Sequence, residues 1–430
     1  MPERRRCWIL VVLAITVRVA AVLVLQSHMV PRSTYEHGEI AANLLAGRGF
    51  AVTFLGADGP TSQQAPFYPA VLAGFYAVGG VESPRSLLML QLAQAAIGGL
   101  MVAGVIRLTG EVAPDRPRMA IAAGLIAALH PTLIYSATHV QVAALAATML
   151  TWTLALAYRA GRTGDHRAAA ACGVVLGLLA LTDPILALVA PAVGWTVAIG
   201  RGWRASLRPV VLMAAVAAGV VSPWVVRNAM VHGEFVLIKS SFGYAFWQGN
   251  CALSEGTDKV VRPSVESALK AGGRSLRGLN ESLWKARHEA GYLDDIALTK
   301  EDYATLSRLP EPARSRLLFR RALDDLRHDP WRYPRLCLRR LRYFVLFDET
   351  NPKARSLAYR IPHVALTLAA VVGLIVMPGP IRRRLVPTFL AVGLIAMFHT
   401  LTIVSARFHI PIEPIMATWA AGLARGSARR

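Results

Sequence analysis

Ten apolar segments, each close to the length that crosses a membrane, constrain the fold of this chain more than any other feature. A transmembrane helix needs about 20 apolar residues to span about 30 Å of hydrocarbon. The segments fall near residues 8–26, 86–106, 119–137, 140–158, 168–182, 185–200, 209–226, 358–378, 384–402 and 408–424. With 54% hydrophobic and 17% charged residues, the chain is too apolar for one soluble core with a polar surface. We therefore predict an all-α polytopic membrane protein with about ten transmembrane helices.

Two long polar connections divide the chain into three predicted parts. Residues 1–226 form an N-terminal transmembrane domain of about seven spans, with a first outer loop over 27–85. Residues 227–357 form a mixed, mostly helical segment, and residues 358–430 add about three spans. Only "TDP" separates the segments at 168–182 and 185–200, so these form either a helical hairpin or one broken span. Pro60, Pro66 and Pro69 predict an extended, ordered stretch in the first loop.

Arginines in the short connections predict the orientation in the membrane. They cluster around residues 107–118, 159–167, 201–208, 382–384 and 425–430. Cytoplasmic loops are enriched in Lys and Arg, so both termini are predicted to be cytoplasmic and both long polar segments extracytoplasmic. The net charge of +21 is typical of topology signals, anionic lipids or an anionic substrate, and we do not predict nucleic-acid binding. Residues 1–26 are expected to be a retained first helix.

Two acidic side chains follow the first apolar segment. Glu36 and Glu39 in "STYEHGEIAANLLAGRGF" are three residues apart, so they share one face of a predicted helix. Carboxylates in a first helical turn also stabilise the helix dipole, which offers a purely structural explanation. The acids are therefore either structural or catalytic on this evidence alone.

Three further stretches give these acids a context. They are "GPTSQQAPFYP" in the first loop, "SPWVVRNAMVHGEF" after the seventh segment, and "RFHIPIEP" before the last. Together with the first loop they resemble the GT-C superfamily of polytopic glycosyltransferases. The similarity is to the bacterial branch near dolichyl-phosphate-mannose protein mannosyltransferases and lipid A aminoarabinose transferases. It implies an inner-membrane enzyme that moves a sugar from a polyprenyl-phosphate donor to a protein, glycan or lipid acceptor on the outer face, with inversion.

The resemblance also implies roles for individual residues. Glu36 best matches the first-loop acid that acts as general base, and Glu39 is the second candidate. Arg407 and Arg227, at predicted outer ends of spans, are expected to hold the donor phosphate, although an Arg there also serves as a headgroup anchor. His409 either bonds the same phosphate or packs.

Related enzymes often carry a second acid, sometimes supporting a metal, where "YSATHVQVAAL" offers His139 and Gln141 instead. We therefore expect no certain cofactor and regard a divalent metal as doubtful. Asp183 either supplies the missing carboxylate or starts the "TDP" turn. The candidates for sugar or acceptor binding are Tyr68, His139, Gln141, Asp183, Trp247 and Asn250.

Two other interpretations stay open. Intramembrane arginines and ten spans also suit a transporter or flippase of lipid-linked glycans, and the missing second acid suits a catalytically degenerate relative. The polar residues lie at helix ends and no halves repeat, which favours the enzyme. Cys251 and Cys337 share one polar segment and could form a disulfide there, while the four cysteines show no metal-binding spacing.

Overall fold

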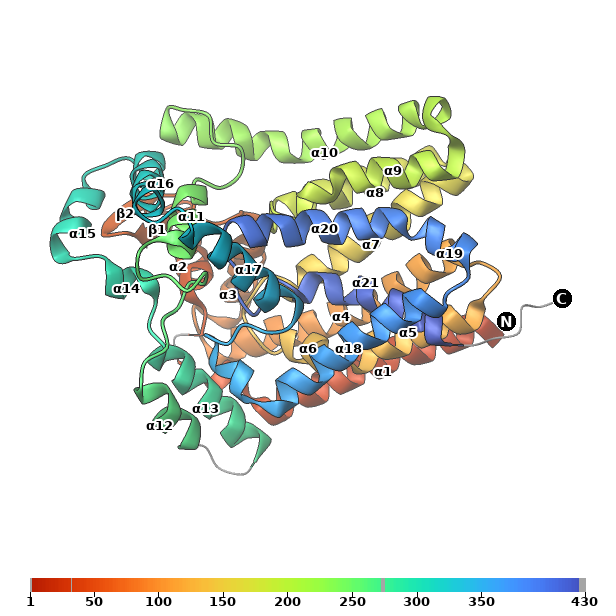
Figure 1. Ribbon diagram of the computed structural model, residues 1–430, viewed down its shortest axis with the longest axis horizontal. Helices are drawn as coiled ribbons and strands as arrows, with labels where there is room; N and C mark the ends of the chain where they lie inside the picture. Colours follow the sequence, from red (N-terminus) through yellow and green to blue (C-terminus); the bar gives the residue numbers. More distant parts are fainter. Residues whose placement is uncertain (1, 32, 272–274, 425–430) are drawn as a thin grey trace.

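The fold is a bundle of helices with polar elements gathered at one end (Figure 1). The computed structural model describes residues 2–31, 33–271 and 275–424. The bundle contains α1 (Pro2–Leu25), α4 (Pro84–Val112), α5 (Pro117–Leu129), α6 (Pro131–Ser136), α7 (Ala143–Thr163), α8 (His166–Ala180), α9 (Ala190–Arg201), α10 (Trp203–His232), α18 (Leu357–Val376), α19 (Gly379–Arg384), α20 (Val386–Leu401) and α21 (Glu413–Ala420). Short 3₁₀ turns η2 (Leu186–Val189), η4 (Ile410–Ile412) and η5 (Ala421–Leu423) adjoin them.

Four helical stretches among the described residues are long and apolar enough to cross a membrane. They are Arg5–Met29, Pro84–Val112, Trp203–His232 and Leu357–Val376. Helical structure also occurs at the other predicted positions, but several of those helices are only 10–17 residues long. The helical membrane-protein fold is therefore confirmed, whereas the number of ten spans stays a prediction.

The predicted span at 119–137 is not continuous. It is broken at His130, which has extended backbone angles (φ −65°, ψ 119°) between α5 and α6. The cause is Pro131, because a residue before proline avoids the helical region and proline itself starts helices well. The chain reverses direction between the segments at 168–182 and 185–200, as in a helical hairpin. Val197 near the end of α9 packs against Gly161 at the end of α7, which is where α8 begins, so α9 returns to the end of the bundle from which α8 started.

A buried arginine ties the first helix to the bundle. The Arg18 guanidinium of α1 is fully buried and donates to the carbonyls of Ala127 and Ala128, both at 3.1 Å. These carbonyls end α5, where no helical N–H remains to pair with them. Gly98 of α4 makes room, because a Cβ there would lie 2.4 Å from the Arg18 side chain. The charge thus acts as a helix cap inside an apolar bundle.

The polar end is built from the two long connections. The first contributes η1 (Ser27–Met29), α2 (Tyr35–Leu45), β1 (Ala51–Phe54), β2 (Ala57–Pro60) and α3 (Phe67–Gly79). The second contributes α11 (Phe242–Asn250), α12 (Ser264–Lys270), α13 (Leu276–Glu289), α14 (Leu293–Ala297), α15 (Lys300–Ser307), α16 (Glu311–His328), α17 (Arg332–Val345) and η3 (Pro352–Arg355). The mostly helical character predicted for residues 227–357 agrees with this.

Two features of the first loop differ from the sequence prediction. Residues 67–79, expected to be extended, form the apolar helix α3, with Pro69 in its first turn, where proline costs no hydrogen bond. Strands β1 and β2 pair antiparallel, from Ala51 opposite Pro60 to Phe54 opposite Ala57, so the fold is not purely helical. Leu55 and Gly56 both have positive φ, as a tight two-residue turn requires.

The basic connections meet at the end opposite the polar elements. The Tyr158 hydroxyl donates to the Arg384 carbonyl at 2.5 Å, and Arg162 pairs with Glu111 at 2.7 Å. The N-terminus and α19 lie at this same end (Figure 1). The cluster at 425–430 lies outside the described residues. Because the described Arg clusters lie at one end of the bundle, one orientation in the membrane can put all of them on the same side.

The polar connections share a core of their own. Phe50 and Phe54 of the first loop pack with Trp247, Leu306 and Leu318 of the second. Glu311 adds a polar joint, because it accepts hydrogen bonds from the Thr61 hydroxyl at 2.5 Å and the Ser62 N–H at 2.8 Å. Cys251 and Cys337 are not joined by a disulfide. This joint fixes the first loop against the second without a covalent link.

Candidate active site

A pocket opens at the polar end, where the connections meet the bundle. Its cavity volume is only about 30 Å³, and it is lined from segments far apart in the chain. The charged lining consists of four cations and one carboxylate, namely Lys259, Arg287, Lys353, Arg407 and Asp258. Such an excess of positive charge in a partly enclosed space attracts an anion.

Lys353 enters the pocket from η3. The Asn351 side chain accepts the Lys353 N–H at 3.1 Å and so caps this turn, which fixes the lysine backbone. The ammonium lies 4.4 Å from the ring centre of Tyr135. Burial, followed by the charges of Arg287 and Arg407, lowers the pKa of Lys353 to about 7. This lysine therefore carries only part of its charge at neutral pH until an anion binds.

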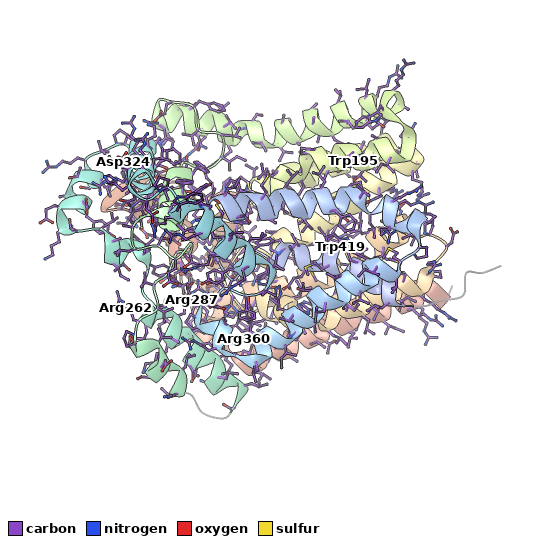
Figure 2. The ribbon with its side chains drawn as sticks, in the orientation of Figure 1. Trp195, Arg262, Arg287, Asp324, Arg360 and Trp419 are labelled. Atoms are coloured by element: carbon purple, nitrogen blue, oxygen red, sulfur yellow. The ribbon has the colours of Figure 1, made fainter. Side chains whose placement is uncertain are left out.

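Lys259 and Arg287 also line the pocket. The Lys259 ammonium lies 3.6 Å from the ring centre of Tyr292 and donates to the Arg287 carbonyl at 3.3 Å. Burial lowers its pKa to about 8, although Asp258 opposes that shift. The Arg287 guanidinium stacks 4.8 Å from the ring centre of Tyr35, where α13 approaches the bundle (Figure 2). Aromatic faces therefore hold both cations in place without neutralising them.

Two residues singled out from the sequence meet in this pocket. Arg407 is exposed and follows α20, while Gln141 lies at the corner between α6 and α7. The Gln141 Nε2 amide is buried and has no hydrogen-bond partner within the described chain. A buried unpaired donor beside four cations is suited to an oxygen-rich anionic ligand.

The two acids of α2 have different surroundings. Glu39 accepts the Thr53 N–H of β1 at 2.7 Å and so holds the hairpin against the helix. Glu36 is exposed in the first turn of α2. Burial lowers the pKa of Lys239, and the nearby carboxylates of Asp183 and Glu36 oppose this shift. Glu36 therefore faces the same charged region as Lys239, and Glu39 is engaged with the backbone.

His37 links α2 to the cationic pocket. Burial, together with the charges of Lys239 and Arg407, lowers the pKa of His37 to about 3. Its ring meets the Tyr68 ring edge-on, with centroids 5.2 Å apart. His37 is thus a buried, neutral imidazole close enough to Lys239 and Arg407 to feel their charges.

Arg227 lies away from the pocket. Its guanidinium donates to the carbonyls of Thr61 at 2.6 Å and Phe50 at 3.0 Å, both in the first loop. It also stacks 4.7 Å from the ring centre of Trp224. These contacts give Arg227 a structural role in joining α10 to the first loop.

Three candidates for sugar binding are buried among protein groups. The Tyr68 hydroxyl donates to Gln94 at 2.8 Å. Trp247 belongs to the core of the polar end and stacks on Tyr244. The Asn250 amide donates to the Phe246 carbonyl at 2.8 Å and accepts from Arg340 at 3.1 Å. The geometry thus favours packing for all three.

His139 and Asp183 are both engaged with neighbouring protein groups. The His139 ring stacks on Trp284, with centroids 5.0 Å apart and an interplanar angle of 11°, so it is held flat. Asp183 accepts the Ile185 N–H at 3.2 Å and so starts the turn into η2, and burial raises its pKa. Cations lie near both residues, with Lys353 and Arg287 near His139, and Lys239 and Arg407 near Asp183.

His409 turns away from the pocket into the bundle. Its Nδ1 lies 3.0 Å from Glu413 and its Nε2 lies 2.8 Å from the Tyr359 hydroxyl. Tyr359 itself lines the pocket. His409 would therefore act on a ligand in the pocket only through Tyr359.

The sequence did not single out Lys259, Arg287 or Lys353. Each lies in the Arg-rich segment 227–357, where single cations do not stand out. Only the "NPK" turn gave a local signal, because Asn before Pro caps a turn and directs the following lysine. Their convergence depends on tertiary structure.

Comparison with known proteins gives the fold a context. No protein-family model matches the sequence, and no curated protein matches it either. Solved structures do match. The apo oligosaccharyltransferase of Archaeoglobus fulgidus is 17% identical, with a TM-score of 0.55, over 98% of this chain and 50% of that one. This chain therefore spans about half the length of that protein.

Two further structures are similar. The oligosaccharyltransferase AglB of A. fulgidus, in complex with an inhibitory peptide and a dolichol-phosphate, matches at 15% identity and a TM-score of 0.50, over 95% of this chain and 50% of that one. ArnT from Cupriavidus metallidurans, bound to undecaprenyl phosphate, matches at 16% identity and a TM-score of 0.44, over 95% and 77%. The oligosaccharyltransferase likeness confirms the GT-C resemblance as regards the fold.

Proposed function

We propose that this chain is a membrane glycosyltransferase that transfers a sugar from a polyprenyl-phosphate donor to an acceptor hydroxyl or amide. The observation that carries the proposal is the pocket with four cations at the polar end of a GT-C-like bundle. AglB, which shares this fold, has been solved with a dolichol-phosphate and a peptide. A lipid-linked phosphate is therefore the anion that best suits both the fold and the pocket.

The donor phosphate would bind between Arg407 and Lys353, with Gln141 as a further donor. Charge-assisted hydrogen bonds to phosphate are stronger than neutral ones, and Arg can make two in parallel. Binding the anion restores the charge of Lys353, whose pKa burial has lowered to about 7. As the glycosidic bond breaks, the phosphate takes the bonding electrons, and the same cations stabilise that charge.

Glu36 is proposed as the general base. The carboxylate takes the acceptor proton while the acceptor atom attacks the anomeric carbon opposite the departing phosphate, which inverts the configuration. Glu36 suits this role because it is exposed and shares the charged region with Lys239. Glu39, which accepts the Thr53 N–H, is proposed to position α2. No step in this scheme uses a metal.

The site is proposed to face the outside of a bacterial inner membrane. The described Arg clusters lie at the opposite end of the bundle, which the positive-inside rule assigns to the cytoplasm. This orientation places the N-terminus inside and the segment 227–357 outside. The acceptor is then a protein, glycan or lipid that is reachable from the outer surface.

Transfer by the purified protein tests the function directly. The full chain in liposomes is given a panel of radiolabelled polyprenyl-phosphate sugars, and label is followed into extracted envelope glycans, lipids and proteins. Transfer by the wild type, lost in Glu36→Gln, supports the enzyme. Movement of the donor across the bilayer without any new bond would identify a flippase. Neither transfer nor movement, with donor binding intact, would identify a degenerate relative.

A further inference from the structure

A cluster of three histidines and one glutamate lies buried in the bundle, outside the pocket. Glu413 begins α21 and is 0% exposed, while His363 of α18 and His409 before η4 are each 1% exposed. His130, at the break between α5 and α6, is 6% exposed. Three separate parts of the chain thus converge on one carboxylate in an apolar surrounding.

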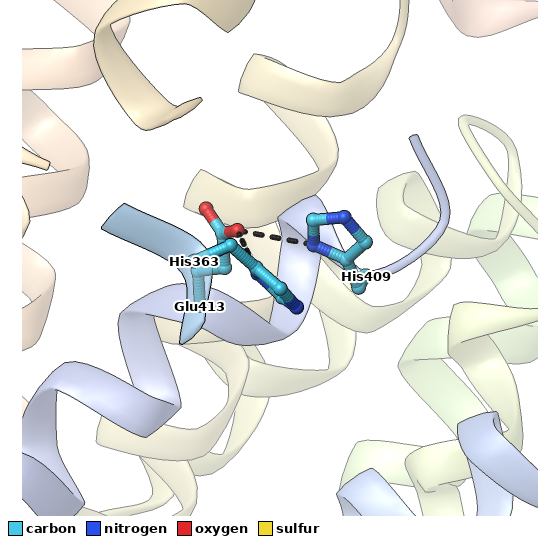
Figure 3. Close-up of side chains that lie close together, drawn as sticks. All are labelled: His363, His409 and Glu413. Atoms are coloured by element: carbon cyan, nitrogen blue, oxygen red, sulfur yellow. Dashed lines mark hydrogen bonds and ion pairs between the residues drawn. The ribbon is translucent and has the colours of Figure 1, made fainter. Parts of the chain in front are cut away.

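The distances suit one metal ion. Glu413 Oε1 lies 3.0 Å from His409 Nδ1 and 3.3 Å from His363 Nδ1 (Figure 3). Glu413 Oε2 lies 3.4 Å from His130 Nε2. The ligand atoms of His363, His409 and Glu413 all lie within 4.8 Å of one another. Tetrahedral zinc with bonds of about 2.0–2.1 Å separates its ligands by about 3.3 Å. His363, His409 and Glu413 could therefore share one ion, and His130, which faces the other Glu413 oxygen, would have to move towards that ion to become a fourth ligand.

The outer hydrogen bonds fix the histidines as ligands. His363 Nε2 lies 3.1 Å from the Val345 carbonyl, which can only accept, so this nitrogen carries a proton. Unless both ring nitrogens carry protons, the lone pair of His363 Nδ1 points at a Glu413 oxygen only 3.3 Å away. Two lone pairs at that distance repel unless a cation lies between them. His409 Nε2 lies 2.8 Å from the Tyr359 hydroxyl, which donates to the Ala406 carbonyl at 3.2 Å and so can accept a proton from this nitrogen.

Two atoms of the cluster lack hydrogen-bond partners. His130 Nε2 and Glu413 Oε2 face each other at 3.4 Å, and neither makes a hydrogen bond with the described residues. Buried polar atoms without partners are costly, so their convergence requires an explanation. A shared cation satisfies both atoms at once.

We propose that His130, His363, His409 and Glu413 bind a first-row divalent metal ion, with zinc the best match. Imidazole nitrogens suit zinc, as does a carboxylate that presents one oxygen to His363 and His409 and the other to His130, whereas magnesium and calcium prefer oxygen ligands alone. Four protein ligands make a closed, structural site. The metal would join α18 and α21 to the α5–α6 break and hold the loop that carries Arg407. This proposal does not depend on the glycosyltransferase assignment.

Metal content tests the site. The full chain, purified with a tag that contains no histidine and without chelator, is analysed by mass spectrometry after dialysis against equimolar zinc. We expect about one zinc ion per chain, falling about tenfold in Glu413→Ala and in His363→Ala. His399→Ala is the matched control, since His399 is equally buried but bonds the Ile403 carbonyl outside the cluster. No metal in the wild type, or undiminished metal in both cluster variants, would overturn the proposal.

X-ray absorption on the wild type keeps the test decisive if the variants do not fold. Nitrogen and oxygen neighbours at about 2.0–2.1 Å, with the outer-shell pattern of imidazole rings, are expected. A sulfur neighbour at about 2.3 Å would move the ion to a cysteine and refute the cluster as its site. A histidine cluster that holds only protons would give no zinc spectrum at all.

Discussion

The ionisation of Lys353 gives the sharpest test of the proposed donor pocket. Its pKa of about 7, lowered by burial and then by Arg287 and Arg407, means that the free pocket loses this charge as the pH rises above 7. A bound phosphate favours the charged form and raises the pKa. Binding above pH 7 therefore takes up a proton, and donor affinity falls as pH rises.

The magnitude follows from the two pKa values. The affinity is reduced by the factor 1 + 10^(pH − pKa), which for Lys353 changes about tenfold between pH 6 and pH 8. Lys259, with a pKa of about 8, adds a further factor of about two over the same range. We expect a fall of about 20-fold in the wild type and about twofold in Lys353→Met.

Calorimetry in detergent with a short-chain polyprenyl-phosphate sugar measures this effect. The donor is a phosphodiester, so its own charge is constant over this range. Titrations in two buffers of different ionisation enthalpy count the protons taken up, with about one expected at pH 8 from Lys353. Lys270→Met, which removes an exposed lysine of α12, should behave as the wild type. A full 20-fold fall in Lys353→Met, or none in the wild type, would refute this account of the pocket.

Three other predictions test the remaining assignments. Glu36→Gln should lower the initial rate of transfer by about 10²–10⁴ without changing donor affinity, and an equal loss in Glu39→Gln would contradict the choice between them. Arg407→Ala should weaken donor binding about 10- to 150-fold, which corresponds to about 1.5–3 kcal/mol, and Arg407→Lys should recover part of that affinity. Wild-type affinity in Arg407→Ala would show that Arg407 is only a surface residue. In a cysteine-free background, an impermeant thiol reagent added outside should label Asp58→Cys and not Thr163→Cys, and the reverse pattern would invert the topology.

The bundle could be predicted from hydropathy because apolar runs report directly on burial in lipid. The break at His130 was also encoded locally, since Pro131 follows it and restricts its backbone. Helix α3 was missed because Pro69 was taken to keep the chain extended. In a first helical turn, however, proline replaces an N–H that has no partner, so its position within the segment matters more than its presence.

Arg407 and Arg227 show that a residue in a family-like motif can serve either ligand binding or the packing of loops. Arg407 and Arg227 occupy similar positions in the sequence, each at the end of an apolar segment, and Arg407 is the first candidate of the two. The structure separates them, because two backbone carbonyls of the first loop occupy the Arg227 guanidinium, whereas Arg407 stays exposed in the pocket. A motif shared with an enzyme family can therefore reflect a joint between loops as well as a ligand contact. Only the accounting of hydrogen-bond donors, residue by residue, distinguishes the two, and it supports our proposal that Arg407 and Lys353 bind the phosphate.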